Sequence, residues 1–358
     1  MILTSDNYNP AGRILLLTLL LAAMPLITMA QIVKEKRIAK SYTVTKNTEV
    51  AFDNSFGLLH IETWDRNQVE VEIEIEVDMK NENHAQKAME KIEVKIDDSN
   101  PASRLAFTTE VKSLNNSKGE GFSIDYRIKM PANLKLEVAN KFGDLVIGDY
   151  QGEIKLRSEY GNMRAGSLNA DSEVIVKFGD GEVTYMKEGE LTVGYSDFDA
   201  DKVGNINADL SFSDVTIGEA GEVSLKIKYG ELSFDNINVL TGKGSFTSIE
   251  IDELSDRLEI EGSYISDLRV DLVRKGFSLI EVDNAFGETQ LGFEPGAGAS
   301  IEADFSFGEL KYDRDLGIKF SHLETDDFKK KSYRGTFGGG KGRVKLSGNY
   351  ASGTLRSE

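Results

Sequence analysis

The stretch KFGDLVIGDYQGEIKLRSEYGNMRAG, residues 141–166, contains one short pattern twice. An aromatic residue, Phe142 or Tyr160, is followed by glycine, by an acid or amide, and by two apolar residues that are separated by one other residue. The aromatic recurs at spacings of 17 or 18 residues as far as Tyr264, and then at 22 and 21 residues. A period this short is typical of a repeat architecture. The recurring aromatic residues are Phe142, Tyr160, Phe178, Tyr195, Phe212, Tyr229, Phe246, Tyr264, Phe286 and Phe307.

The order of residues inside one repeat predicts where the aromatic side chain points. Ile206, Ala208, Leu210 and Phe212 alternate with polar residues, and the alternation restarts at Val215 after two intervening residues. Side chains two apart on a strand point the same way, so we expect the aromatic residue to share the buried face with the aliphatic ones. The two residues after it shift the alternation by one, which predicts a bulge or corner there. The aromatic residues are therefore predicted to stack as a ladder in the core.

One repeat then consists of a strand, a corner, a short strand and a turn. It has too little apolar surface to fold alone, but stacked repeats bury each other's apolar positions. The sequence therefore predicts an all-β fold, a single-chain parallel β-helix or solenoid of about ten coils over residues 134–312, rising about 4.8 Å per coil. Parallel crossovers favour a right-handed helix, with a left-handed one as the alternative. An antiparallel sandwich would not keep the aromatic residues in step.

The segments on either side of the repeats have other patterns. Residues 31–133 are expected to form a β-rich cap, with strict alternation from Val69 to Val77 and one early coil at Phe56-Gly57. Residues 313–358 lose the rhythm and are expected to cap the other end. The ends of a solenoid present unpaired backbone groups, so a cap at each end would prevent edge-to-edge association.

The first 30 residues read as a secretory signal peptide. Arg13 precedes an apolar run from Ile14 to Ala23, and a cleavage-like triplet ends at Ala30. The mature chain would begin near Gln31 and be exported to the periplasm, the outer-membrane surface or the medium. An uncleaved N-terminal anchor is the alternative, and no later run reaches the 18 apolar residues of a membrane span.

Composition narrows the classes of partner. The chain has no cysteine, so neither a disulfide framework nor a lipid on a leader cysteine is possible. Its formal net charge of -18 argues against nucleic acid and anionic lipid headgroups. The 34 glycines and five prolines fit a β protein with many tight turns.

Three stretches carry a resemblance to a known family: HIETWDRNQVEVE from residue 60, YRIKMPANLKLEVANKFGDLVIGDYQGEIKL from residue 126, and the iterated glycine-acid units. Over most of the mature chain the sequence resembles the bacterial putative-adhesin family of unknown function. The resemblance implies an adhesin-like β-helix and an envelope location. It brings no ligand and no catalytic residues to transfer.

A search for catalytic or metal-binding chemistry leaves the site residues unassigned. His60, His84 and His322 are far apart in the sequence, which disfavours zinc and iron. The glycine-rich stretch at 335–342 has Gly342 where a phosphate loop needs Ser or Thr. Acids after the corner suggest either calcium ligands or Asx turns, and we favour turns and expect no cofactor. These residues are Asp144, Asn162, Asp180, Asp197, Asp214, Glu231, Glu288 and Glu309.

The short turns between strands leave little to wall a substrate cleft, so an enzyme is not expected, and a polysaccharide-cleaving activity is the less favoured alternative. We predict a non-catalytic, adhesin-like binding or structural module of the cell envelope. Extended repetitive surfaces suit extended partners, either polysaccharide or protein. A periplasmic sensor or scaffold in envelope signalling is the alternative. The ligand, the mode of attachment and the oligomeric state are left open.

Overall fold

The computed structural model describes residues 32–114, 119–326 and 329–358, and the protein is an all-β molecule with one large sheet system. Within these residues the helices are α2 (Glu82–Met89) and the 3-10 helix η1 (Arg314–Leu316). Neither is long and apolar enough to cross a membrane. The predicted signal peptide lies outside the described residues.

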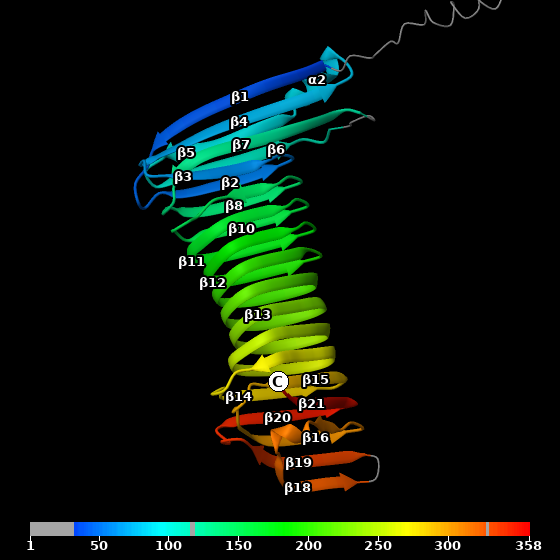
Figure 1. Cartoon of the computed structure of the whole chain (residues 1–358). Coiled ribbons are helices and arrows are strands. Elements are labelled where there is room, and N and C mark those ends of the chain that lie inside the picture. Colours follow the sequence, from blue (N-terminus) through cyan, green and yellow to red (C-terminus); the bar gives the residue numbers. More distant parts are fainter. Residues whose placement is uncertain (1–31, 115–118, 327–328) are drawn as a thin grey trace, which may run out of the picture.

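Parallel strands stacked one repeat apart make up the middle of the molecule (Figure 1). Strand β10 (Ile154–Glu159) pairs with β8 (Lys135–Lys141) on one side and with β11 (Met163–Lys177) on the other. Strand β12 (Gly181–Gly194) continues the series to β13 (Asp197–Val273). Each residue lies beside its equivalent in the next repeat, so apolar positions meet apolar positions throughout.

The core follows from this register. Val138, Leu156, Val174, Leu191 and Ala208 are partners in successive repeats, and all are buried. Burying each of the larger side chains contributes about 1.5–3 kcal/mol. Because every repeat adds one equivalent residue to each column, the buried aliphatic columns run across the strands, along the stack of repeats.

The aromatic residues occupy the corners, and the prediction that they are buried is wrong. Phe142, Tyr160 and Phe178 have φ values of 59°, 58° and 59°, in the left-handed region. The corner therefore begins at the aromatic residue itself, not after it as expected. This conformation breaks the alternation one position early and turns the ring outward, to exposed fractions of 45%, 46% and 44%. The predicted stacking in register is confirmed.

The N-terminal segment extends the two faces of the stack. Strands β2 (Glu49–Ser55) and β3 (Leu59–Trp64) pair in parallel with β8 and β9, which confirms a first repeat at Phe56-Gly57. Beyond β2 lie β6 and then β5; beyond β3 lie β7, β4 and then β1. The β1, β4 and β5 pairings are antiparallel, and these strands cover that end in Figure 1. The bounds are β1 Ile32–Thr43, β4 Gln68–Met79, β5 Ile92–Asn100, β6 Arg104–Val111, β7 Gly121–Pro131 and β9 Leu145–Ile147.

The C-terminal segment departs from chain order. Strand β20 (Gly342–Asn349) lies between β14 (Leu279–Asn284) and β16 (Ala299–Ser306), parallel to both. Strand β21 lies in the same way between β15 and β17. Residues 342–357 thus form an inserted repeat, although the whole of 313–358 was expected to cap the end. Only β18 and β19 lie beyond β16. The bounds are β15 Gly287–Phe293, β17 Leu310–Tyr312, β18 Lys319–Asp326, β19 Lys330–Phe337 and β21 Ala351–Ser357.

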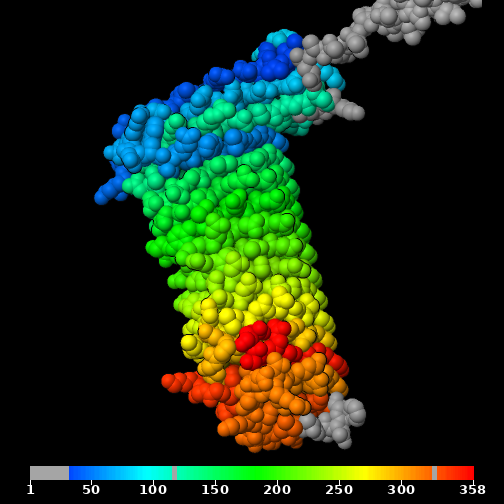
Figure 2. Space-filling view, viewed as in Figure 1, coloured from blue at the N-terminus to red at the C-terminus, as the bar shows by residue number. Residues whose placement is uncertain are grey.

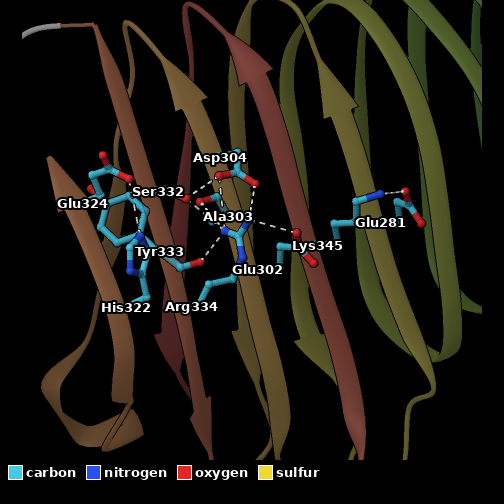
Figure 3. A network of polar contacts seen from close by, with 10 residues as sticks. All are labelled: Glu281, Glu302, Ala303, Asp304, His322, Glu324, Ser332, Tyr333, Arg334 and Lys345. Atoms are coloured by element: carbon cyan, nitrogen blue, oxygen red, sulfur yellow. Dashed lines mark hydrogen bonds and ion pairs between the residues drawn. The ribbon is translucent and has the colours of Figure 1, made fainter. Parts of the chain in front are cut away.

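Ion pairs on the outer face hold these late strands together (Figure 3). Arg334 of β19 donates through Nη2 to Asp304 Oδ2 of β16 at 2.7 Å and lies 2.9 Å from Glu302 Oε1. Lys345 of β20 donates to Glu281 of β14 at 2.6 Å. Partial burial works to raise the pKa of Asp304, but hydrogen bonds from Arg334 and Ser332 and the guanidinium charge outweigh it, so the net shift is downward.

Candidate functional site: an exposed aromatic ladder

A continuous stack of aromatic rings follows the corners along the molecule, and we call it the aromatic ladder. Neighbouring ring centroids are 4.4–5.3 Å apart, with interplanar angles of 2–20°. Because each ring belongs to a different repeat, the backbone pairing sets the spacing. In order, the ladder consists of Phe56, Phe142, Tyr160, Phe178, Tyr195, Phe212, Tyr229, Phe246, Tyr264, Phe286, Tyr350 and Phe307.

Phenylalanine and tyrosine alternate strictly from Phe142 to the end of the ladder. The inserted repeat places Tyr350 between Phe286 and Phe307, and so continues an alternation that chain order alone breaks. Tyrosine hydroxyls therefore recur at every second rung, about 9.6 Å apart for strands spaced at ~4.8 Å. Among the residues that the structure describes, the hydroxyls of the five ladder tyrosines have no hydrogen-bond partner.

The ladder residues are exposed because of their backbone conformation. Apart from Phe286, all of them have φ between 53° and 68°. A residue with a β-carbon is strained there by about 1–2 kcal/mol, whereas glycine is not and asparagine is strained less. An aromatic pair contributes about 0.5–1.5 kcal/mol beyond its buried area. About half of each ring is also buried, which contributes roughly 2 kcal/mol more, so stacking and burial together offset the strain of the corner.

Glycine after the ring permits the close approach of successive corners. A β-carbon on Gly143 would lie 2.0 Å from the carbonyl oxygen of Gly57, and one on Gly161 would lie 2.1 Å from that of Gly143. In two repeats serine takes this place, as Ser196 and Ser213. Ser196 Oγ donates to Gly194 O at 2.9 Å and accepts from Gly179 N at 3.3 Å. Both solutions leave the rings free to stack at the strand spacing.

Buried polar side chains at the corner donate hydrogen bonds to its backbone carbonyl groups. The buried Asn140 donates from Nδ2 to the carbonyl oxygens of Gly57 at 2.9 Å and Asp144 at 2.8 Å. In the neighbouring repeat, the buried Ser158 donates to Gly161 O at 3.0 Å. Buried carbonyl groups left without donors would be costly, so these side chains keep the sharp corner stable.

Side chains two residues after the ring accept hydrogen bonds from the backbone of the next repeat. Asp144 Oδ1 accepts from Asn162 N at 3.0 Å, and Asn162 Oδ1 accepts from Asp180 N at 3.1 Å. Asp214 accepts from Glu231 N at 3.1 Å in the same way. These hydrogen bonds join residues 17 or 18 apart in neighbouring repeats, so they are not the local Asx turns predicted from the sequence. No group of three or more metal-binding side chains with the geometry of a metal site occurs in the described residues.

Two charged rows flank the aromatic ladder. The lysine row comes directly before three of the rings: Lys141 Nζ lies 5.5 Å and 5.6 Å from the centroids of Phe142 and Tyr160, and Lys228 Nζ lies 5.2 Å from that of Tyr229. Lys177 has the same position in its repeat. Glu159 has this position before Tyr160, and its Oε2 lies 3.3 Å from Lys141 Nζ. The acid row lies on the opposite side of the corner, two residues after the ring. It consists of Asp144, Asp180, Asp197, Asp214, Glu231, Glu288 and Glu309.

The grooves of the outer faces are weaker candidates for a functional site than the aromatic ladder, because their charged side chains already pair with each other. One of about 260 Å³ is lined by charged residues that include Glu49, Arg104 and Lys155. Arg104 lies 3.5 Å from Glu49, and Lys155 lies 2.7 Å from Glu173, so ion pairs already involve much of this charge. The three histidines remain separate, on β3, α2 and β18.

Figure 2 shows the stacked repeats as a long column. Comparison with solved structures finds several chains that align with most of this one at low identity and low TM-score. A putative cell adhesion protein from Clostridium sporogenes shares 13% identity, with a TM-score of 0.21 over 91% of this chain and all of that one. A putative adhesin from Bacteroides fragilis shares 12%, at 0.28 over 90% and 97%. A protein from Parabacteroides distasonis described as a putative lipid binding protein shares 9%, at 0.27 over 89% and 96%.

Two of these names agree with the family that the sequence resembles, the putative adhesins. No protein-family model matches the chain, and no curated protein matches it. The aromatic ladder is thus the feature that any functional argument must start from. The sequence located every ring except Tyr350 and predicted the stacking in register, but it placed the rings inside. A signal for the outer position is the Gly or Ser that follows most of the rings, since such a residue marks where the chain turns.

Proposed function

We propose that this chain is a non-catalytic, exported module of the cell envelope that folds as a parallel β-solenoid and binds an extended partner through the aromatic ladder. The parallel pairing of strand residues with their equivalents one repeat on supports the solenoid. Right-handed winding is the expected sense for parallel crossovers. Export rests on the signal-like residues 1–30.

The exposed ladder is the observation that carries the binding role. Ten of its rings have exposed fractions between 37% and 54%. For side chains of roughly 200 Å² each, the strip exposes on the order of 1,000 Å² of mostly apolar surface. Monomeric proteins usually expose a largest apolar patch of about 300–600 Å², and larger ones mark interaction sites. Strained aromatic corners where glycine would fit without strain support the same conclusion.

The geometry of the rings favours a partner that is itself long and regular. Each ring covers the faces of its neighbours, so only ring edges and tyrosine hydroxyls are offered to a partner. A small ligand would contact one or two rungs, whereas a polymer lying along the column contacts many. Polysaccharides and proteins with an extended surface both meet this requirement.

A ladder variant tests the proposal while keeping the fold. Asparagine tolerates the left-handed conformation, so Tyr195→Asn, Phe212→Asn and Tyr229→Asn together remove three rings and keep their corners. The control variant Val33→Asn with Leu323→Asn removes exposed apolar side chains away from the ladder. Residues 31–358 would be applied to a glycan array and to immobilised envelope proteins.

We expect the ladder variant to lose at least about tenfold in affinity for any bound partner, and the control variant to bind like the parent. Equal binding by parent and ladder variant would rule out the ladder as the binding surface. Protease treatment of intact producing cells tests the location: cleavage supports surface display, and complete resistance argues against adhesion.

A further inference from the structure

We propose that the aromatic ladder binds the aromatic ladder of a second copy of this chain, with the two columns side by side and parallel. This inference rests on the proposed binding role of the ladder and names its partner. It follows from four properties of the ladder: its area, its period, its alternation of ring types and the charges beside it.

The exposed area is sufficient for a reversible pair. Ten rings have exposed fractions of 37–54%, and the strip offers on the order of 1,000 Å² per copy. If contact between two convex edges covers half of it, the pair buries about 1,000 Å² in total, at the lower end of the range for specific interfaces. An interface of this size is expected to be weak and concentration-dependent.

The period of the ladder selects a second copy over other long molecules. The rings repeat every 4.4–5.3 Å because the backbone pairing fixes them. An identical ladder has the same period and can stay in register along the whole column. A polymer with another repeat loses register after a few rungs. Matched side-chain ladders also form the interfaces between paired sheets in cross-β assemblies.

The alternation of phenylalanine and tyrosine sets the register of the pair. With no axial shift, each tyrosine edge meets a tyrosine edge, and two hydroxyls without partners in the described residues can bond to each other, since each is both donor and acceptor. A shift by one rung places every hydroxyl against a phenylalanine ring and loses these bonds. The structure therefore favours shifts of an even number of rungs.

The two charged rows select the direction. A twofold axis along the column places the lysine row of one copy opposite the acid row of the other. A twofold axis across the column places acid row against acid row and antiparallel columns against each other. Since each copy has a net charge of -18, the arrangement that brings opposite charges together at the seam is preferred.

Sedimentation equilibrium of residues 31–358, at about 0.15 M salt where the Debye length is about 8 Å, measures the association. We expect a monomer–dimer equilibrium at micromolar to submillimolar concentration. The ladder variant should raise the dissociation constant at least about tenfold, and the control variant should leave it unchanged. Circular dichroism and the thermal midpoint check that both variants fold.

The absence of cysteine in the chain makes the direction measurable. Asn349→Cys places one spin label beside Tyr350, near the C-terminal end of the ladder. In a parallel pair the two labels are close together; in an antiparallel pair they are separated by most of the column, on the order of 40–50 Å. A short distance supports the proposal, and a long one overturns it.

The two proposals fail in different ways. A chain that stays monomeric at all these concentrations, or a dimer that the ladder variant does not weaken, overturns the self-association. If the ladder variant still loses binding on the glycan array in that case, the proposed function stands and its partner is a polysaccharide. If neither dimerisation nor binding to the glycan array and the envelope proteins depends on the ladder, both proposals are wrong.

Discussion

The buried aliphatic columns and the exposed aromatic ladder have the same register but opposite surroundings. Leu210 and Phe212 are two residues apart in one repeat, yet Leu210 is 1% exposed and Phe212 is 47% exposed. Both stack on their equivalents in the next repeats because the backbone pairing is shared. The difference comes from one dihedral angle, the φ of 53° at Phe212. Stacking is thus a property of the repeat, whereas burial is decided at each position.

Substitutions at these two positions should give the largest contrast in stability. Leu210→Ala removes a fully buried side chain and should lower the free energy of unfolding by about 2–5 kcal/mol. Phe212→Asn loses stacking and the buried half of the ring but relieves strain in the left-handed region, so its effect should be smaller, about 1–2 kcal/mol. Denaturant unfolding, with hydrogen exchange in this repeat as a local probe, measures both.

Similar losses for the two variants would mean that the rings, not only the aliphatic columns, hold the repeats together. In that case the exposed ladder would need no binding role to explain it. Hydrogen exchange matters because repeat proteins can open locally without unfolding completely.

A pair of glycines tests how the ladder attains its spacing. Gly143→Ala would place a β-carbon 2.0 Å from Gly57 O, a backbone atom that cannot move aside easily. We expect it to lower the free energy of unfolding by about 1–3 kcal/mol and to separate Phe56 from Phe142. Gly148→Ala meets nothing within 4 Å and should be neutral or stabilising by up to about 1 kcal/mol.

Thermal unfolding of the two variants gives the comparison, and aromatic near-ultraviolet circular dichroism reports the ring stack. An unchanged ring signal in a folded Gly143→Ala protein would contradict the view that glycine sets the approach of the corners. The matched control shows that a methyl group on this part of the chain is not harmful in itself.

The sequence predicts the repeat well because the repeat is local. Spacing and alternation identify the strands of the middle region and the first repeat at Phe56, since a parallel stack brings equivalent residues together. The same alternation misplaces the rings, because it extrapolates an extended backbone through a residue such as Phe142 that is not extended. Bulky residues rarely adopt the left-handed conformation, so the aromatic residue itself gave no indication that the backbone turns there.

The C-terminal order could not be predicted for a different reason. Residues 342–357 have the pattern of a repeat, with Val344 and Leu346 alternating before Tyr350. Their place between two earlier repeats depends on which strand edges are open when they arrive, which is a long-range property. The spacing of 21 residues between Phe286 and Phe307 is compatible with two arrangements: the repeat of Tyr350 lies between theirs, or it lies after that of Phe307. The strict Phe–Tyr alternation is the one sequence signal that would have located Tyr350.

Charged pairs on the outer face should contribute far less than the buried aliphatic columns, and the pair of Asp304 with Arg334 is the best case. Its guanidinium spans both carboxylate oxygens, and the pKa of Asp304 is lowered in the folded protein because these hydrogen bonds outweigh partial burial. A lowered folded-state pKa stabilises the protein above the unfolded value near pH 4, and this contribution disappears as the pH falls through the folded value. Asp304→Asn should therefore cost about 0.5–1 kcal/mol at neutral pH, since both side chains are partly exposed, and this cost should decrease as the pH falls toward the lowered pKa of Asp304.

Asp315 on η1 makes no ion pair in the part of the chain that the structure describes, so Asp315→Asn is the matched control for the change in net charge. Urea unfolding of parent and both variants between pH 3 and 7 gives the differences. If the loss for Asp304→Asn were the same at every pH, the carboxylate charge would not be its cause. A loss as large as that of Leu210→Ala would instead mean that ion pairs of the outer face stabilise the protein as much as the buried aliphatic columns do. The expected difference between surface and core would then be wrong.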